Sequence, residues 1–112
     1  MWNQELPHDV RRALFGGSGA VRVWSLVGAP RAPFAAVLAC ELDPGGRVGA
    51  HVQERHAEIV IVIEGDARVN VSGRVSTVAP GGVIELPVGE VLAIENGSNE
   101  QSLRYLIIKV GG

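Results

Sequence analysis

Short runs of β-branched and aliphatic residues, separated by turn-forming residues, constrain this chain more than any other feature. From Val21 onward such runs alternate with clusters such as Asp43-Pro44-Gly45-Gly46 and Asn96-Gly97-Ser98-Asn99. Gly and Asn accept positive φ angles and proline fixes φ, as tight chain reversals demand. No helical period interrupts the pattern, so the sequence predicts an all-β sandwich or barrel of antiparallel strands.

The same pattern predicts about nine to ten short strands. We expect them at residues 21–27, 34–42, 47–53, 58–64, 67–71, 75–79, 83–86, 91–95 and 103–110. Residues 1–19 show no alternation and are expected to form a short helix or an arm across the barrel. A length of 112 residues suits one hydrophobic core, so residues 20–112 are expected to form a single domain.

Composition argues against several classes of partner. The formal charge of -2, with Lys and Arg scattered singly, provides no basic field for nucleic acid. The apolar runs fall far short of the roughly 18 residues that suggest a membrane span. The opening Met1-Trp2-Asn3-Gln4-Glu5 lacks a basic n-region, which favours a cytoplasmic protein. Cys40 is the single cysteine, and its apolar surroundings predict a small buried hydrophobe.

The segment from Glu58 to Glu64 is apolar on both faces of its predicted strand. Strand alternation places Ile59, Ile61 and Ile63 on one face and Val60 with Val62 on the other. An antiparallel strand with one face in water alternates with polar residues instead. We therefore expect the second face to be covered, either by another sheet of the same chain or by a second copy in a homodimer.

Three polar residues mark the candidate site. His51 and Gln53 are two residues apart in one predicted strand and so share a face, while Glu58 begins the next strand after a short loop. The three side chains are therefore expected to converge. A buried His beside a Glu has two interpretations at this point: a chemical centre, or a hydrogen-bonded pair that only satisfies both groups.

The spacing around these residues resembles the paired motifs of the cupin superfamily. The family patterns are Gly-x5-His-x-His-x(3 or 4)-Glu-x6-Gly and Gly-x5-Pro-x-Gly-x2-His-x3-Asn. The matching positions are Gly45, His51, Glu58 and Gly65 in the first motif, then Gly81, Pro87, Gly89 and Asn96 in the second. The resemblance implies a cupin-type double-stranded β-helix, or jelly-roll barrel, which is often dimeric and commonly holds one divalent metal ion.

The departures from the family pattern fall on metal-ligand positions. By resemblance, His51 and Glu58 are retained ligands, whereas Gln53 and Leu92 stand where the family has histidines. The Gln53 carbonyl is a hard oxygen donor, and Leu92 offers none. His56, in the loop before Glu58, is a candidate replacement. The implied cofactor is one weakly held divalent ion, Fe, Mn, Ni, Cu or Zn, at His51, Gln53, Glu58 and His56.

Three functions fit these residues. One is metal-assisted chemistry on a small organic molecule in the barrel lumen. Another is metal-free proton transfer of the isomerase or cyclase type, with His51 as acid or base and Glu58 orienting it. A third is a binding or sensing barrel without catalysis. In each, a small molecule is expected to contact His51 and Glu58 together with the predicted ligand-binding residues Gln53, Val60, Val62, Leu92 and Ile94.

Overall fold

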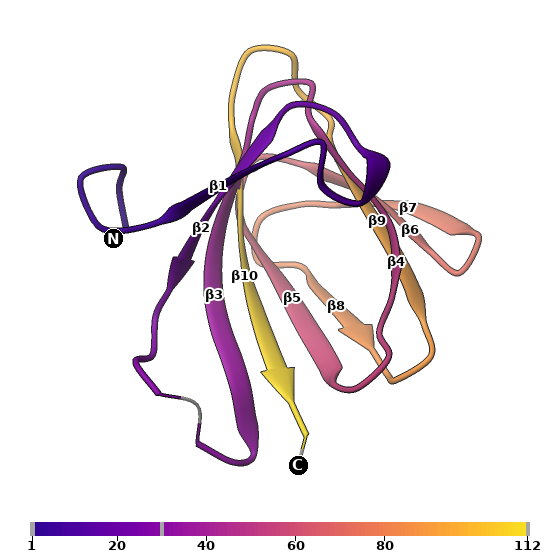
Figure 1. Cartoon of the computed structure of the whole chain (residues 1–112). Helices are drawn as coiled ribbons and strands as arrows, with labels where there is room; N and C mark the ends of the chain where they lie inside the picture. The colour runs from indigo at the N-terminus through magenta and orange to yellow at the C-terminus, as the bar shows by residue number, and fades with distance from the viewer. Residues whose placement is uncertain (1, 30, 112) are drawn as a thin grey trace.

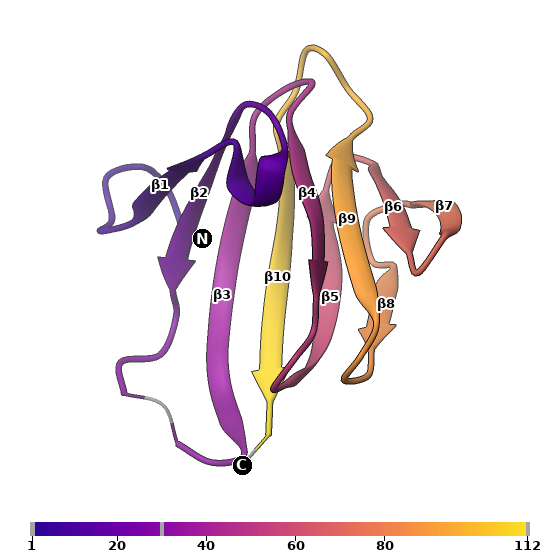
Figure 2. The ribbon, with the colours of Figure 1, turned by 45° about the vertical axis from the view of Figure 1, so that its right-hand side comes forward.

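The computed structural model describes residues 2–29 and 31–111, which form two antiparallel sheets facing each other (Figures 1 and 2). One sheet has the order β1-β2-β3-β10-β5-β8 and the other β4-β9-β6-β7. None of the helical segments in this part of the chain is long or apolar enough to cross a membrane. The elements are β1 (Asp9–Arg12), η1 (Leu14–Gly16), β2 (Ala20–Ser25), β3 (Phe34–Leu42), β4 (Arg47–Val52), β5 (Ala57–Glu64), β6 (Ala67–Val71), β7 (Arg74–Val78), β8 (Val83–Leu86), β9 (Val91–Asn96) and β10 (Leu103–Val110).

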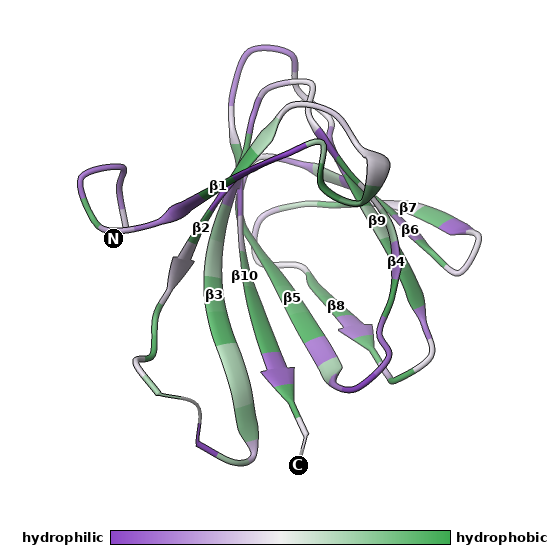
Figure 3. Ribbon diagram, in the orientation of Figure 1, coloured by the Kyte–Doolittle hydropathy of each residue, from purple (hydrophilic) through white to green (hydrophobic). Residues whose placement is uncertain are grey.

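The apolar core lies between the two sheets, where the central strands are hydrophobic in Figure 3. Strand β10 lies between β3 and β5 and pairs with both. Its pairing with β3 joins residues farther apart in the sequence than any other pairing in the large sheet. Val60 and Val62 of β5 are buried in the core, whereas Ile59 on the opposite face is 37% exposed. The predicted all-β barrel is therefore confirmed, as is the alternation within β5.

The N-terminal segment adds a strand that the sequence pattern does not reveal. β1 pairs antiparallel with β2, in the register Arg11 to Val21, and the short 3-10 helix η1 follows it. Before β1, the chain crosses the outer face of the large sheet and covers Trp24. The Trp24 Nε1 donates to the Asn3 carbonyl oxygen at 2.9 Å, and the His8 ring lies 4.9 Å from the Trp24 ring. Residues 2–19, expected to form a short helix or an arm, therefore contain a segment that covers Trp24, the strand β1 and the 3-10 helix η1.

A β-bulge in β4 determines which of its side chains face inward. Val48 pairs with Ile94 and His51 pairs with Leu92, so β4 has one residue more than β9 between these pairs. Val48 and His51 consequently face the same interior although they are three positions apart. Gly49 lies in the bulge, and a Cβ there would be 1.9 Å from the Phe15 carbonyl oxygen. A glycine at this position thus lets η1 pack directly against β4.

The remaining motif residues hold turns. Gly45 and Gly65 have φ angles of 66° and 87°, in the left-handed region that glycine adopts without strain. The buried Asn96 side chain donates from Nδ2 to the carbonyl oxygens of Asp43 and Gln101, at 3.0 and 2.8 Å. It therefore ties the end of β9 to the loop between β3 and β4. These residues shape the barrel that positions the site.

Candidate functional site

An inner cavity of about 90 Å³ lies between the two sheets, beneath η1. Its wall is mainly aliphatic, with a few polar groups where the strands β4, β5 and β10 meet. The lining residues are Arg11, Leu14, Phe15, Val21, Val23, Leu38, Cys40, Val48, His51, Glu58, Leu92, Ile94, Tyr105, Ile107 and Lys109. Such an apolar chamber with few convergent polar groups is typical of a small-molecule site.

Glu58 is the acidic group of this cavity and is only 2% exposed. Its Oε1 lies 3.8 Å from the Lys109 Nζ, and its Oε2 accepts a hydrogen bond from the Gln53 Nε2 at 3.3 Å. Burial raises the pKa of Glu58 above its ordinary value, and Lys109 opposes this shift only in part. The surroundings of the carboxyl group thus favour its protonated form more than water does.

His51 is half-buried at the boundary of the cavity. Its ring stacks on Phe15, with centroids 4.3 Å apart and planes inclined by 16°. Its Nδ1 donates to the Gly49 carbonyl oxygen at 3.3 Å, which leaves Nε2 as the basic atom of the neutral ring. Burial lowers the pKa of His51, and the charge of Lys109 acts in the same direction. The partner of Nδ1 is therefore the Gly49 carbonyl rather than Glu58.

Lys109 is a candidate site residue that the sequence pattern does not indicate. It lies opposite Glu58 in the register of β10 and β5 and brings the cation nearest to that carboxylate. No local motif surrounds it, and 50 residues of chain separate the two positions. Phe15 and Arg11 were missed for the same reason, since β1 and η1 carry no strand periodicity. Only the long-range strand register brings these groups to the cavity.

The residues predicted for the site occupy three different environments. His51, Glu58, Leu92 and Ile94 line the inner cavity. Gln53 and His56 instead line an outer depression of about 520 Å³, which also includes Phe15, His51 and Lys109. Val60 and Val62 lie on the inner face of β5 but are packed within the core, outside the described cavity lining.

Two further titratable groups of the cavity stay neutral at ordinary pH. Cys40 is buried, and its burial raises the pKa of the thiol to about 12. Burial also raises the pKa of Tyr105 well above its ordinary value. Both side chains therefore contribute wall surface and neutral hydrogen-bonding groups, in agreement with the small buried hydrophobe expected at Cys40.

The side chains around Glu58 do not fit the metal site that the resemblance implies. Within residues 2–29 and 31–111, no three His, Cys, Asp or Glu side chains form a metal-binding group. Leu92, directly opposite His51 across β4 and β9, replaces the third histidine with an apolar side chain. Gln53 directs its amide nitrogen at Glu58, and Lys109 already provides positive charge there. These side chains therefore do not provide the donor set that the family motif gives a divalent cation.

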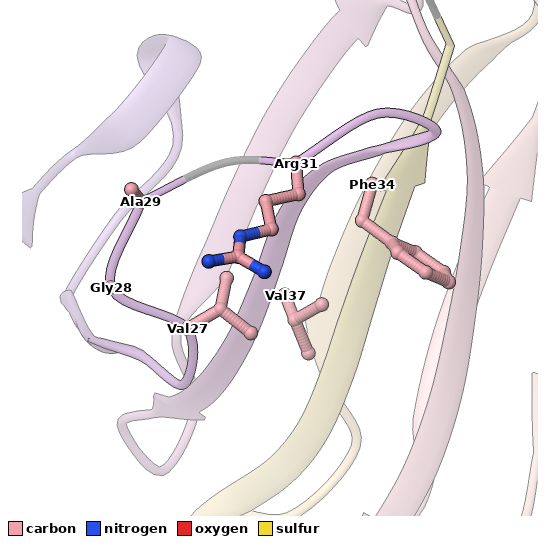
Figure 4. Close-up of a pocket in the computed structure, with 6 residues that line it drawn as sticks. All are labelled: Val27, Gly28, Ala29, Arg31, Phe34 and Val37. Carbon is pink, nitrogen blue, oxygen red and sulfur yellow. The ribbon is translucent and has the colours of Figure 1, made fainter.

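Another hollow lies outside the barrel, at the loop between β2 and β3 (Figure 4). It measures about 560 Å³ and is lined by Val27, Gly28, Ala29, Arg31, Phe34 and Val37. It shares no lining residue with the inner cavity. Arg31 is the single charged residue in the lining of this hollow, which therefore has no acidic side chain to pair with a base.

Two facing antiparallel sheets with a polar cluster at one end of the lumen define a small β-barrel of the jelly-roll class. The sequence model of the cupin domain matches residues 38–109. The chain therefore belongs to the cupin family. No curated protein matches the sequence.

Solved structures agree with this assignment. A crystal structure described as a predicted oxalate decarboxylase from Thermotoga maritima is 25% identical, with a TM-score of 0.88 over 97% of this chain and 96% of that one. The polyketide cyclase RemF from Streptomyces resistomycificus is 24% identical, with a TM-score of 0.78 over 98% and 77% of the two chains. KdgF from a Halomonas species is 20% identical, with a TM-score of 0.71 over 99% and 94%. The last two show the shared fold alone.

Proposed function

We propose that this cupin binds a small organic molecule in the inner cavity and moves a proton on it without a metal. The observation that carries the proposal is Glu58: a nearly inaccessible carboxyl group at the polar end of an apolar chamber, with Lys109 beside it. A carboxyl group of raised pKa in an apolar site is a recurrent arrangement for acid–base catalysis. The ligand class is a compact molecule with an aliphatic body and one carbonyl group.

The proposed step is a reversible proton exchange at the carbon next to a carbonyl group, which requires no oxidant or co-reactant. The Glu58 carboxylate takes a proton from the carbon next to the carbonyl, and the electron pair of that C–H bond forms the enolate. The Lys109 ammonium stabilises the enolate oxygen, as preorganised charge does in related chemistry. Glu58 then returns the proton to carbon. His51, whose Nε2 is basic, provides a second proton acceptor at the cavity boundary.

Proton exchange in heavy water tests this proposal. Butanone and isobutyraldehyde are incubated with the protein in D₂O, and loss of the C–H signal next to the carbonyl is followed by proton NMR. We expect exchange that persists in EDTA and falls roughly 10²–10⁴-fold in Glu58→Gln, the usual contribution of a general base. Glu85→Gln, an exposed glutamate on β8, is the control. Equal exchange by wild type and Glu58→Gln would contradict the proposal.

Binding without catalysis is a second candidate, favoured by the volume of the cavity. About 90 Å³ is well below the roughly 300–1,000 Å³ of most ligand pockets, so the chamber fits a compact molecule only. A pure binding barrel predicts that butanone raises the melting temperature while its C–H signal persists in D₂O. The exchange experiment therefore separates the two functions with the same probe.

We further propose that a second copy covers the outer face of β5 and β10. Ile59 and Ile61 of β5 lie next to Ile108 and Leu106 of β10, and all four are exposed or half-buried. The N-terminal arm covers Trp24 on β2, which leaves this aliphatic surface open within the described chain. An apolar surface of this kind favours association.

Sedimentation equilibrium tests the dimer directly. We expect wild type to have twice the chain mass and Ile61→Arg to have the mass of a single chain, since a buried arginine without a partner disfavours the contact. Val75→Arg, at an exposed position on β7 of the other sheet, is the matched control. A single-chain mass for the wild type at every concentration would overturn the dimer and leave the proton-transfer proposal intact.

A further inference from the structure

The helix η1 separates the two hollows at the site. The inner cavity measures about 90 Å³ and the outer depression about 520 Å³. Three side chains, Phe15, His51 and Lys109, line both. These residues therefore form the partition between a small apolar chamber and a wider polar one, and η1 supplies the partition's aromatic ring.

Phe15 makes this partition with a largely exposed ring. Its side chain is 55% exposed and contacts His51 in the stacked arrangement described above. Leu14, the preceding residue, is half-buried and lines the inner cavity alone. The two neighbours thus have different roles, because Leu14 fills the inner chamber and Phe15 closes it from the outer depression.

The backbone holds η1 firmly in this position. Phe15 and Ala13 have φ angles of 53° and 49°, in the left-handed region that non-glycine residues adopt rarely. Below them, Ser18 and Arg47 exchange two backbone hydrogen bonds of 2.9 Å. A Cβ at Gly17 would lie 1.9 Å from the Arg47 carbonyl oxygen, so the segment meets β4 at backbone contact. Backbone contact and hydrogen bonds with β4 therefore fix the position of η1 and of the Phe15 ring that it carries.

We infer that Phe15 and Leu14 set the upper size of the molecule that the barrel binds. This inference rests on the proposed function, because it concerns the ligand of the same inner cavity. At roughly 15–30 Å³ for each water-sized group, the chamber of about 90 Å³ holds a ligand of roughly three to six non-hydrogen atoms. Without the Phe15 ring the two hollows join, and a longer ligand extends past His51 toward the polar wall at Gln53 and His56.

A series of straight-chain alcohols from 1-propanol to 1-octanol tests the inference, since only length changes along it. Binding is measured by calorimetry for wild type and Phe15→Ala. For wild type we expect affinity to rise about fourfold per methylene and to stop rising near five carbons. For Phe15→Ala we expect the rise to continue, so that 1-octanol binds at least about tenfold tighter than to wild type. The affinity for 1-propanol should stay within about twofold, because no methylene is added or lost.

Phe34→Ala is the matched control, because Phe34 is 50% exposed and lines only the separate hollow of Figure 4. It should keep the wild-type cutoff. Leu14→Ala is a second variant that enlarges the inner chamber without opening the partition, and it should move the cutoff by one or two carbons, about the side-chain length removed. If Phe15→Ala fails to fold, Leu14→Ala still tests whether η1 limits the length of the ligand.

The outcomes separate the inference from the function on which it rests. An identical length dependence in wild type, Phe15→Ala and Leu14→Ala overturns the size-limiting role but leaves ligand binding intact. An absence of binding by folded wild type for every alcohol overturns both, because the inner cavity is then not a ligand site. A cutoff that disappears in Phe34→Ala as well also overturns the role of Phe15.

Discussion

Two glutamates, Glu41 and Glu58, are buried almost equally on opposite faces of the large sheet. Glu41, on β3, is 4% exposed and Glu58, on β5, is 2% exposed. Glu41 lies beneath the N-terminal arm, 2.8 Å from the Arg104 Nη2 and 3.9 Å from the Arg22 Nη1, and accepts a hydrogen bond from Gln4. Glu58 faces an apolar cavity with Lys109 as its cation and one amide donor.

The difference shows that burial alone does not mark a chemical site. Glu41 forms ion pairs with two guanidinium groups, which hold its side chain in one place. Glu58 has fewer charged partners and lines a cavity. The ion pairs of Glu41 therefore favour a role in the stability of the fold, whereas the proposed proton transfer uses Glu58, and substitution of each glutamate can break this contrast.

The largest expected effect is on folding, from Glu41→Gln. Removing this charge leaves Arg22 and Arg104 without their shared buried carboxylate, and breaking such a pair costs about 3 kcal/mol in unfolding free energy. Urea denaturation measures it. Glu64→Gln, which removes the exposed partner of Arg104, should cost less than about 1 kcal/mol. Equal losses from the two variants would break the contrast between buried and exposed pairs.

A smaller effect is expected in the pH dependence of stability, through Glu58. Because burial raises the pKa of Glu58 in the folded protein, the folded state binds this proton more tightly than the unfolded chain does. Its stabilising contribution is complete below the unfolded pKa, about 4.3, and is lost as pH rises through the folded value.

Urea denaturation across that pH window should therefore show a decline in wild-type unfolding free energy that is reduced in Glu58→Gln. Glu58→Gln should also be less destabilising than Glu41→Gln at neutral pH. A Glu58→Gln profile parallel to that of the wild type would show that Glu58 does not titrate as its surroundings indicate.

Lys109→Met should mainly change titration and leave folding nearly unaffected. Lys109 is partly exposed, so its ion pair contributes about 1 kcal/mol or less to stability. Without the ammonium group, burial acts unopposed and the pKa of Glu58 rises further. Carbon-13 NMR titration of the Glu58 carboxyl group measures this shift directly. A lower pKa in Lys109→Met would contradict the assigned electrostatics.

The smallest effect is expected from metal removal. A resident metal bound to the folded state would stabilise it by mass action, so its removal would lower the melting temperature. Because the groups around Glu58 do not form a ligand set, we expect EDTA or added Zn, Mn or Fe(II) to shift the melting temperature by less than about 1 °C. Near-stoichiometric metal in untagged protein would contradict this expectation and support the metal site that the family motif implies.

Much of the fold could be predicted from the sequence because its signals are local. Alternation and turn residues located the strands 34–42, 67–71, 83–86 and 103–110 at the bounds that the structure has. Strand alternation at His51 and the position of Glu58 at the start of the next strand predicted that the two side chains converge, and both line the inner cavity. These inferences required only neighbouring residues and the period of a strand.

The rest of the site depends on long-range pairing that no local pattern specifies. Lys109 reaches Glu58 through the register of β10 with β5, and Phe15 reaches His51 through a short segment in rare backbone conformations. Alternation extended from Gln53 also predicted a regular β4, and the extra residue near Gly49 changes which side chains face inward. The partners of Glu58 and His51 therefore follow from strand pairing and backbone geometry, which the local sequence pattern does not specify.

The bulge in β4 makes the orientation of His51 a matter of residue count. Three positions separate Val48 from His51, so a regular strand of the same length would turn His51 toward solvent and place Val52 inside, whereas deleting Ala50 would remove the bulge and keep His51 opposite Leu92. The inward orientation of the imidazole is thus set by the irregular backbone at Gly49 and Ala50, and it can change without any substitution at position 51.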